Sequence, residues 1–133
     1  MTEKVKYLSS ILAPVSLGEL IDKITILEIK QIHMTGIKLK NVNKELELLK
    51  FILKDQNLEI DINLVTQLRE INNNLWEIED KIRMKENMQK FDKEFIQLAR
   101  SVYKQNDVRA SIKKEINQKY NSELIEEKSY NHY

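Results

Sequence analysis

The chain has 133 residues, of which 32% are charged and 41% hydrophobic, and its 22 basic and 21 acidic side chains leave a net charge of +1. It contains two glycines, one proline and no cysteine, and every Gly and Pro lies within the first 36 positions. Small all-β folds need such residues at their tight turns, so this composition argues against them. The lack of cysteine excludes disulfides, thiolate zinc sites and cysteine nucleophiles, and the balanced charge offers no basic field for nucleic acid or an anionic membrane.

Residues 1–15 are predicted to form a short extended lead-in, because Pro14 disfavours helical backbone at the residue before it. The longest apolar run, residues 11–15, is far shorter than the ~20 residues of a membrane-spanning helix. The apolar stretch within residues 4–13 is too short for a signal peptide and is split by Ser9 and Ser10. We therefore expect a cytoplasmic protein with a single domain.

The first helix is predicted to begin after Ser16, where the run Ser-Leu-Gly-Glu forms a capping box. In this motif the Ser16 hydroxyl accepts a hydrogen bond from the Glu19 amide, and the Glu19 carboxylate accepts one from the Ser16 amide. An apolar stripe with the helical period follows, and Gly36 is able to end the helix in a left-handed conformation. The stripe consists of Leu17, Leu20, Ile21, Ile24, Leu27 and Met34.

Three further helical segments are predicted over about residues 38–54, 61–88 and from Asp92 to Tyr120, each from an apolar stripe at 3.6-residue spacing. The stripe slips at Asn106 and Asp107, where either a fifth helix is capped or polar groups enter the inner face. Short connections between these helices predict an all-α, antiparallel helical bundle of four to five helices over residues 16–120. The tail, residues 121–133, is expected to dock back in part. The heptads of the second and third helices also permit a coiled-coil oligomer.

Two rows of polar residues are candidates for a ligand site. On the third helix, the candidates Trp76, Glu79 and Arg83 share one flank beside the apolar stripe with Val65 and Asn72. They could form a structural rim with a surface ion pair or line a pocket for a polar ligand. The fourth helix supplies the second row, which could face the first across a cleft and hold a phosphate or carboxylate, or could be a solvated face. This second row comprises Arg100, Tyr103, Asn106, Asp107, Arg109 and Lys113.

A metal site is the weakest candidate. Glu19 and Asp22 on the first helix, and Glu77 and Asp80 on the third, form two Glu-x-x-Asp steps that could share Mg²⁺ and a nucleotide phosphate. All-helical nucleotide pyrophosphohydrolases pair such a step with a Glu-x-x-Glu step, which this chain does not have in the required order. We therefore expect neither a metal nor a cofactor.

Several stretches resemble a family of small all-helical proteins, a domain of unknown function, from bacteria and marine phages. The likeness covers about residues 11–130 and is most specific over Ser16–Lys30, which reads SLGELIDKITILEIK. It includes NLWEIEDKIR at 74–83, LARSVY at 98–103, NDVRA at 106–110 and EEKSY at 126–130. The resemblance implies no established reaction, but it implies a possible surface-polysaccharide context.

These observations favour a small non-catalytic binding or accessory protein with a polar cleft between helices. Its partner would be an anionic small molecule or another protein, and a homo-oligomer is possible. The alternative is an enzyme that acts on a phosphorylated or carboxylated small molecule, with Arg100, Arg109 and Lys113 binding the anion and Glu79 or Asp107 as the acid–base group.

Overall fold

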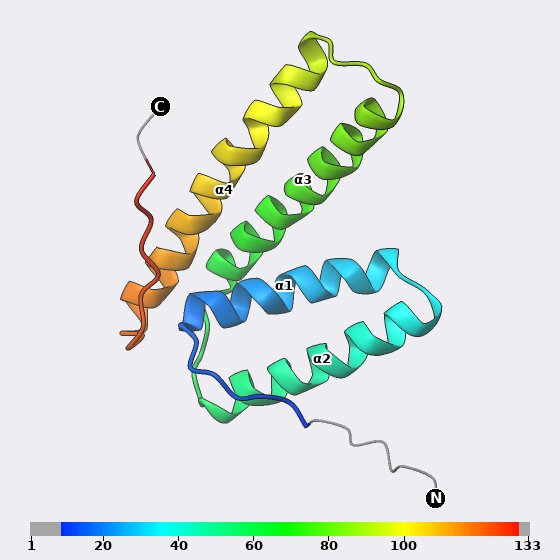
Figure 1. Ribbon diagram of the computed structural model, residues 1–133. Coiled ribbons are helices and arrows are strands. Elements are labelled where there is room, and N and C mark those ends of the chain that lie inside the picture. Colours follow the sequence, from blue (N-terminus) through cyan, green and yellow to red (C-terminus); the bar gives the residue numbers. More distant parts are fainter. Residues whose placement is uncertain (1–8, 131–133) are drawn as a thin grey trace, which may run out of the picture.

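The computed structural model describes residues 9–130, and this part of the chain folds into four helices without a strand (Figure 1). The helices are α1 (Leu17–His33), α2 (Gly36–Asp55), α3 (Ile62–Asn87) and α4 (Lys93–Lys119). They form two antiparallel hairpins, α1 with α2 and α3 with α4, which meet at an angle. The prediction of an all-α helical bundle is confirmed.

Helix α1 is the centre of the fold, because it packs against each of the other three helices, whereas α2 packs mainly on α1. One side of α1 meets α2 through a core of Leu20, Ile24, Leu27, Val42 and Leu46. A second core joins α1 to the other hairpin. It consists of Ile21, Leu64, Leu68, Ile112 and Ile116.

The apolar stripes seen in the sequence therefore face inward, and burying a Leu or Ile side chain stabilises the fold by about 1.5–3 kcal/mol. The heptad stripe of α2 packs within its own chain, with Val42 and Leu46 buried on α1.

The helix ends follow the capping residues closely. Ser16 accepts from the Glu19 amide at 3.1 Å, as the capping box predicts, but the Glu19 carboxylate accepts from the Lys113 ammonium instead of the Ser16 amide. Gly36 has the predicted left-handed backbone, with φ of +63°. It begins α2, however, since α1 already ends at His33.

Helix α4 runs without a break through Asn106 and Asp107. The interpretation of Asn106 and Asp107 as a helix cap is therefore wrong. The apolar stripe slips here because polar groups enter the inner face of α4, which was the alternative interpretation. Polar side chains of α4, beginning at Arg109, face α1 where an apolar stripe would otherwise continue.

At the two ends of the described part, residues 9–16 and 120–130 lie outside the helices. Residues 1–8 and 131–133, which belong to the predicted lead-in and tail, lie outside the described part. The C-terminal segment, residues 121–130, runs alongside α4 (Figure 1). Polar atoms attach it: the Ser122 hydroxyl accepts from the Leu17 amide at 3.2 Å, and Glu126 pairs with Lys113 at 2.8 Å.

Candidate functional site

A row of polar side chains on α4 forms the contact with the first turns of α1. Arg109, Lys113 and Asn117 follow one another at intervals of four residues, so they share one face of α4. Each of them bonds to a different residue near the start of α1. Together they add a set of directed hydrogen bonds beside the apolar core that Ile112 and Ile116 form with Ile21.

Asp22 is the most deeply buried member of this set, with 0% of its surface exposed. Arg109 binds its carboxylate with two donors: Nε lies 2.9 Å from Oδ1, and Nη2 bonds to Oδ2. The Asn72 amide of α3 also donates to Oδ1 at 2.9 Å and to the Thr25 hydroxyl at the same distance. A buried carboxylate needs such donors to offset the loss of its hydration. The bonds to Asp22 also raise the pKa of Arg109 despite its partial burial.

Lys113 lies among three carboxylates. Its ammonium is 2.6 Å from Glu19, 2.8 Å from Glu126 and 3.8 Å from Asp22, and its side chain is only 9% exposed. Burial opposes the charge, but the hydrogen bonds to Glu126 and Glu19 more than offset it, so the pKa of Lys113 is raised. The same contact with Lys113 lowers the pKa of Glu126. Both groups are therefore charged at neutral pH.

The third contact depends on a glycine. The Gly18 amide donates to Asn117 Oδ1 at 2.7 Å, and a Cβ at position 18 would lie 2.5 Å from the Lys113 carbonyl oxygen. Only glycine allows the two backbones to approach so closely. Gly18 is thus a packing residue of the α1–α4 contact.

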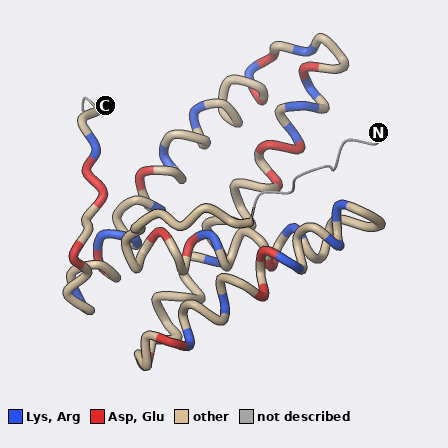
Figure 2. The backbone as a smooth tube through the Cα atoms, turned by 60° about the horizontal axis from the view of Figure 1, so that its bottom comes forward, with Lys and Arg blue, Asp and Glu red and all other residues tan. Residues whose placement is uncertain are grey.

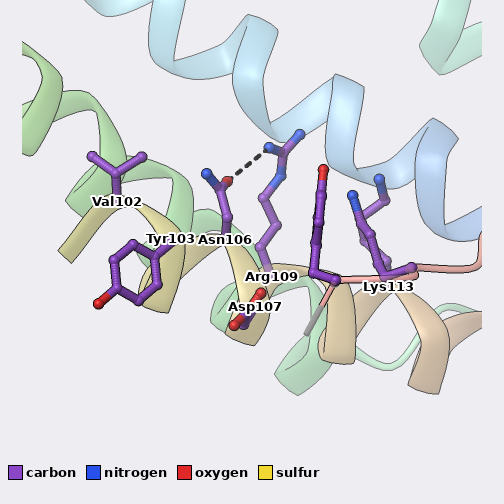
Figure 3. A pocket seen from close by; sticks show the side chains of 9 residues that line it. Val102, Tyr103, Asn106, Asp107, Arg109 and Lys113 are labelled. Carbon is purple, nitrogen blue, oxygen red and sulfur yellow. Dashed lines mark hydrogen bonds between the residues drawn. The ribbon is translucent and has the colours of Figure 1, made fainter. Parts of the chain in front are cut away.

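Two cavities open on either side of Arg109. The first, of about 580 Å³, lies on α4 beside the C-terminal segment. In Figure 3, Asn106 and Arg109 project from α4 towards α1, while Tyr103 and Asp107 leave the helix on other sides. The lining of this first cavity consists of Val102, Tyr103, Asn106, Asp107, Arg109, Ala110, Lys113, Lys128 and Tyr130. We call this space the α4 cavity.

The second cavity, of about 620 Å³, lies between α1, α3 and α4, and shares Asn106 and Arg109 with the first. Trp76 lines it and stacks on His33 of α1, with ring centroids 4.6 Å apart. The indole Nε1 of Trp76 is buried and has no hydrogen-bond partner among residues 9–130. Glu79 and Arg83, which also line this cavity, form the predicted ion pair at 2.6 Å.

The structure brings eight of the nine candidate residues to these two cavities. Trp76, Glu79 and Arg83 line the second, and Tyr103, Asp107 and Lys113 line the first, with Asn106 and Arg109 between them. Arg100 is the exception: it is exposed and lines none of the three described cavities. The third cavity adjoins the first, between α4 and the C-terminal segment.

Sequence reasoning missed the partners that hold these residues. Asp22 was considered only as a metal ligand. Its position between Ile21 and Ile24 did not reveal its burial, because Lys23 lies between the same two residues and is exposed. Asn72 was assigned to the row beside the apolar stripe of the third helix, but its bonds to Asp22 and Thr25 were not predicted. Lys128 and Tyr130 were marked only by the resemblance of the run EEKSY, because the tail has no periodic pattern.

Charge does not gather in one region of the molecule. Figure 2 shows basic and acidic residues interleaved along the helices. Within residues 9–130, no group of three or more His, Asp or Glu side chains is arranged to hold a metal ion. Glu19 and Asp22, the first of the two Glu-x-x-Asp steps, instead accept hydrogen bonds from Lys113 and Arg109.

Comparison with known proteins identifies a family. A family model described as "Family of unknown function (DUF6165)" matches residues 12–133, so the chain belongs to that family. No curated protein and no solved structure matches the chain. Over the described residues, none of the helices combines the length and the apolar character needed to cross a membrane.

Proposed function

We propose that this member of DUF6165 is a non-catalytic binding protein whose α4 cavity takes a small ring compound with one carboxylate or similar anionic group. The observation that carries the proposal is a fixed guanidinium on the wall of a cavity of about 580 Å³. Arg109 cannot swing away, because Asp22 holds two of its nitrogens. A donor whose orientation is set before binding loses little entropy when a ligand arrives.

The Nη1 amino group of Arg109 makes no bond to Asp22 and can donate to a ligand. Nη1 reaches Asn106 Oδ1 at 3.5 Å (Figure 3), which is at the outer limit of a hydrogen bond. A ligand oxygen could replace this weak contact at small cost and accept from Nη1 at normal length. The exposed amide of Asn106 could turn its own donor towards the same oxygen.

The charge around the cavity limits the ligand to a single negative charge. Behind the lining, Asp22, Glu19 and Glu126 already neutralise Arg109 and Lys113, and Glu126 also pairs with Lys128 at 3.2 Å. A polyphosphate would find no excess positive charge here. A ligand with one carboxylate, bound by hydrogen bonds, fits this balance of acidic and basic groups around the cavity.

The remaining lining suits a ring. Tyr103 and Tyr130 offer aromatic surface, and Val102 and Ala110 contribute apolar area between them. Ligand sites commonly combine such a mostly apolar wall with a few directed polar groups.

Binding is better supported than catalysis. Of the two groups considered as acid–base residues, Glu79 is held by Arg83 at 2.6 Å and lies in the other cavity. Asp107 lines the α4 cavity but is exposed to solvent.

Thermal unfolding with a panel of probes tests the proposal, since a ligand of the native state raises the melting temperature Tm. We expect benzoate, 4-hydroxybenzoate or glucuronate to raise Tm, and Mg²⁺, pyrophosphate and nucleoside diphosphates to leave it unchanged. Asn106→Ala should abolish the rise. Arg100→Gln, on the same helix but outside the cavities, should retain it. A panel without any effect, or an unchanged effect in Asn106→Ala, would overturn the proposal.

A further inference from the structure

The outward face of α2 carries a second heptad stripe that nothing in the described chain covers. Positions 37, 41, 44, 48, 51 and 55 alternate in steps of four and three along this face, and all six are exposed. Three of them are large apolar residues: Ile37, Leu48 and Phe51 are 79%, 48% and 69% exposed. The other three are Asn41, Lys44 and Asp55.

This stripe is separate from the one that forms the core. The inner stripe of α2 is buried on α1 through Val42 and Leu46. By helical spacing the outer stripe lies on the opposite side of α2, and α2 itself lies at the edge of the molecule in Figure 1. Alternating steps of three and four place residues in a seam that a second helix can fill by knobs-into-holes packing.

The charges on α2 determine which second helix fits. Within the outer stripe, Lys44 is the basic residue and Asp55 the acidic one. A parallel, in-register pair of α2 helices would set Lys44 against Lys44 and Asp55 against Asp55. An antiparallel pair can instead set Lys44 of each helix against Asp55 of the other.

One antiparallel register satisfies the apolar and the charged positions together. If Leu48 packs against Phe51 of a second copy, the same register sets Lys44 against Asp55 of that copy. At the flanking positions, Glu47 then faces Lys54 of the second copy. All six of these side chains are exposed in the single chain, and two-fold symmetry makes each contact occur twice.

We propose that the protein forms a two-fold symmetric homodimer through antiparallel pairing of its α2 helices in this register. Leu48 and Phe51 lie next to the two-fold axis, and the Lys44–Asp55 and Glu47–Lys54 pairs flank them. No residue of α2 lines the α4 cavity, so the dimer leaves that cavity open, and the inference is independent of the proposed ligand.

Sedimentation equilibrium tests the dimer directly. The wild-type chain should sediment at twice its mass of 15.9 kDa, and Phe51→Glu should sediment as a folded monomer with unchanged helical circular dichroism. Lys44→Asp should weaken the dimer at least tenfold, and the double variant Lys44→Asp/Asp55→Lys should restore it. Lys50→Asp makes the same charge change on α2 away from the outer stripe, and should leave the dimer intact.

Cross-linking tests the orientation, because the natural chain has no cysteine. In an oxidised mixture of Lys44→Cys and Asp55→Cys chains, antiparallel pairing predicts mixed disulfide dimers and few dimers of either variant with itself. Self-linked Lys44→Cys dimers would show parallel pairing and overturn the proposal. A monomeric wild-type chain, or a dimer that survives Phe51→Glu, would overturn it as well.

Discussion

Replacing Arg109 with alanine removes the main partner of a carboxylate that has no contact with water. Asn72 still donates one bond to Asp22, and Lys113 remains 3.8 Å away, held by Glu19 and Glu126. Breaking one side of a buried ion pair costs about 3–5 kcal/mol, because the charge left behind has lost its hydration without compensation. We expect this loss for Arg109→Ala.

The loss can be converted into a shift of Tm. At about 2.1 cal/mol/K per residue, the unfolding entropy of 133 residues is about 0.28 kcal/mol/K. A loss of 3–5 kcal/mol therefore lowers Tm by about 11–18 °C. Circular dichroism at the helical band during heating measures this shift.

Replacing the acidic partner, Asp22, provides the control. Asp22→Ala leaves a guanidinium whose side chain is 27% exposed, so Arg109 can turn towards water. The expected cost is about 1–3 kcal/mol, and the double variant should be more stable than Arg109→Ala alone. The reasoning is refuted if Arg109→Ala costs less than about 1 kcal/mol, or if Asp22→Ala is the more damaging of the two single changes.

Two further predictions concern the contacts beside this ion pair. Gly18→Ala should cost about 1–3 kcal/mol, because its Cβ would meet the Lys113 carbonyl at 2.5 Å. Gly36→Ala should cost only about 1 kcal/mol from its positive φ, since its surroundings are open. Equal melting temperatures for the two variants would contradict the close approach of the α1 and α4 backbones at Gly18. The lowered pKa of Glu126 stabilises the fold above its unfolded value of 4.5, and this stabilisation is lost as pH falls through the folded pKa. Melting curves should therefore show Glu126→Gln less stable than wild type by about 0.2–1 kcal/mol at pH 7. The difference should vanish as the pH is lowered to 3. A stability difference that persists at pH 3 would count against the Lys113 contact.

The helices could be predicted from the sequence because their signals are local. A capping serine, an apolar stripe and the scarcity of Gly and Pro after residue 36 determine where α1, α2 and α3 begin and end within a few residues. The continuity of α4 could not be predicted in this way. Asn106 and Asp107 are compatible with a cap, and only the contacts that Arg109 and Lys113 make with α1 explain why polar residues interrupt the stripe.

The candidate site was predictable in its residues but not in its arrangement. Helical spacing identified rows on α3 and α4, but it could not show that Arg109 lies between two cavities. It also could not show that a carboxylate 87 positions away orients this guanidinium. Arg100 has the same spacing relation to Tyr103 that Asn106 has to Arg109, yet it points to solvent. Long-range partners of this kind depend on the angle at which the two hairpins meet.

An NMR titration tests the central claim, a ligand in the α4 cavity, most directly. With ¹⁵N-labelled protein and 4-hydroxybenzoate, we expect saturable shifts concentrated on residues 102–113 and 126–130, with little change along α2. The same titration of Asn106→Ala should show no saturable shift. Shifts that are absent, or that cluster away from the α4 cavity, would contradict the account.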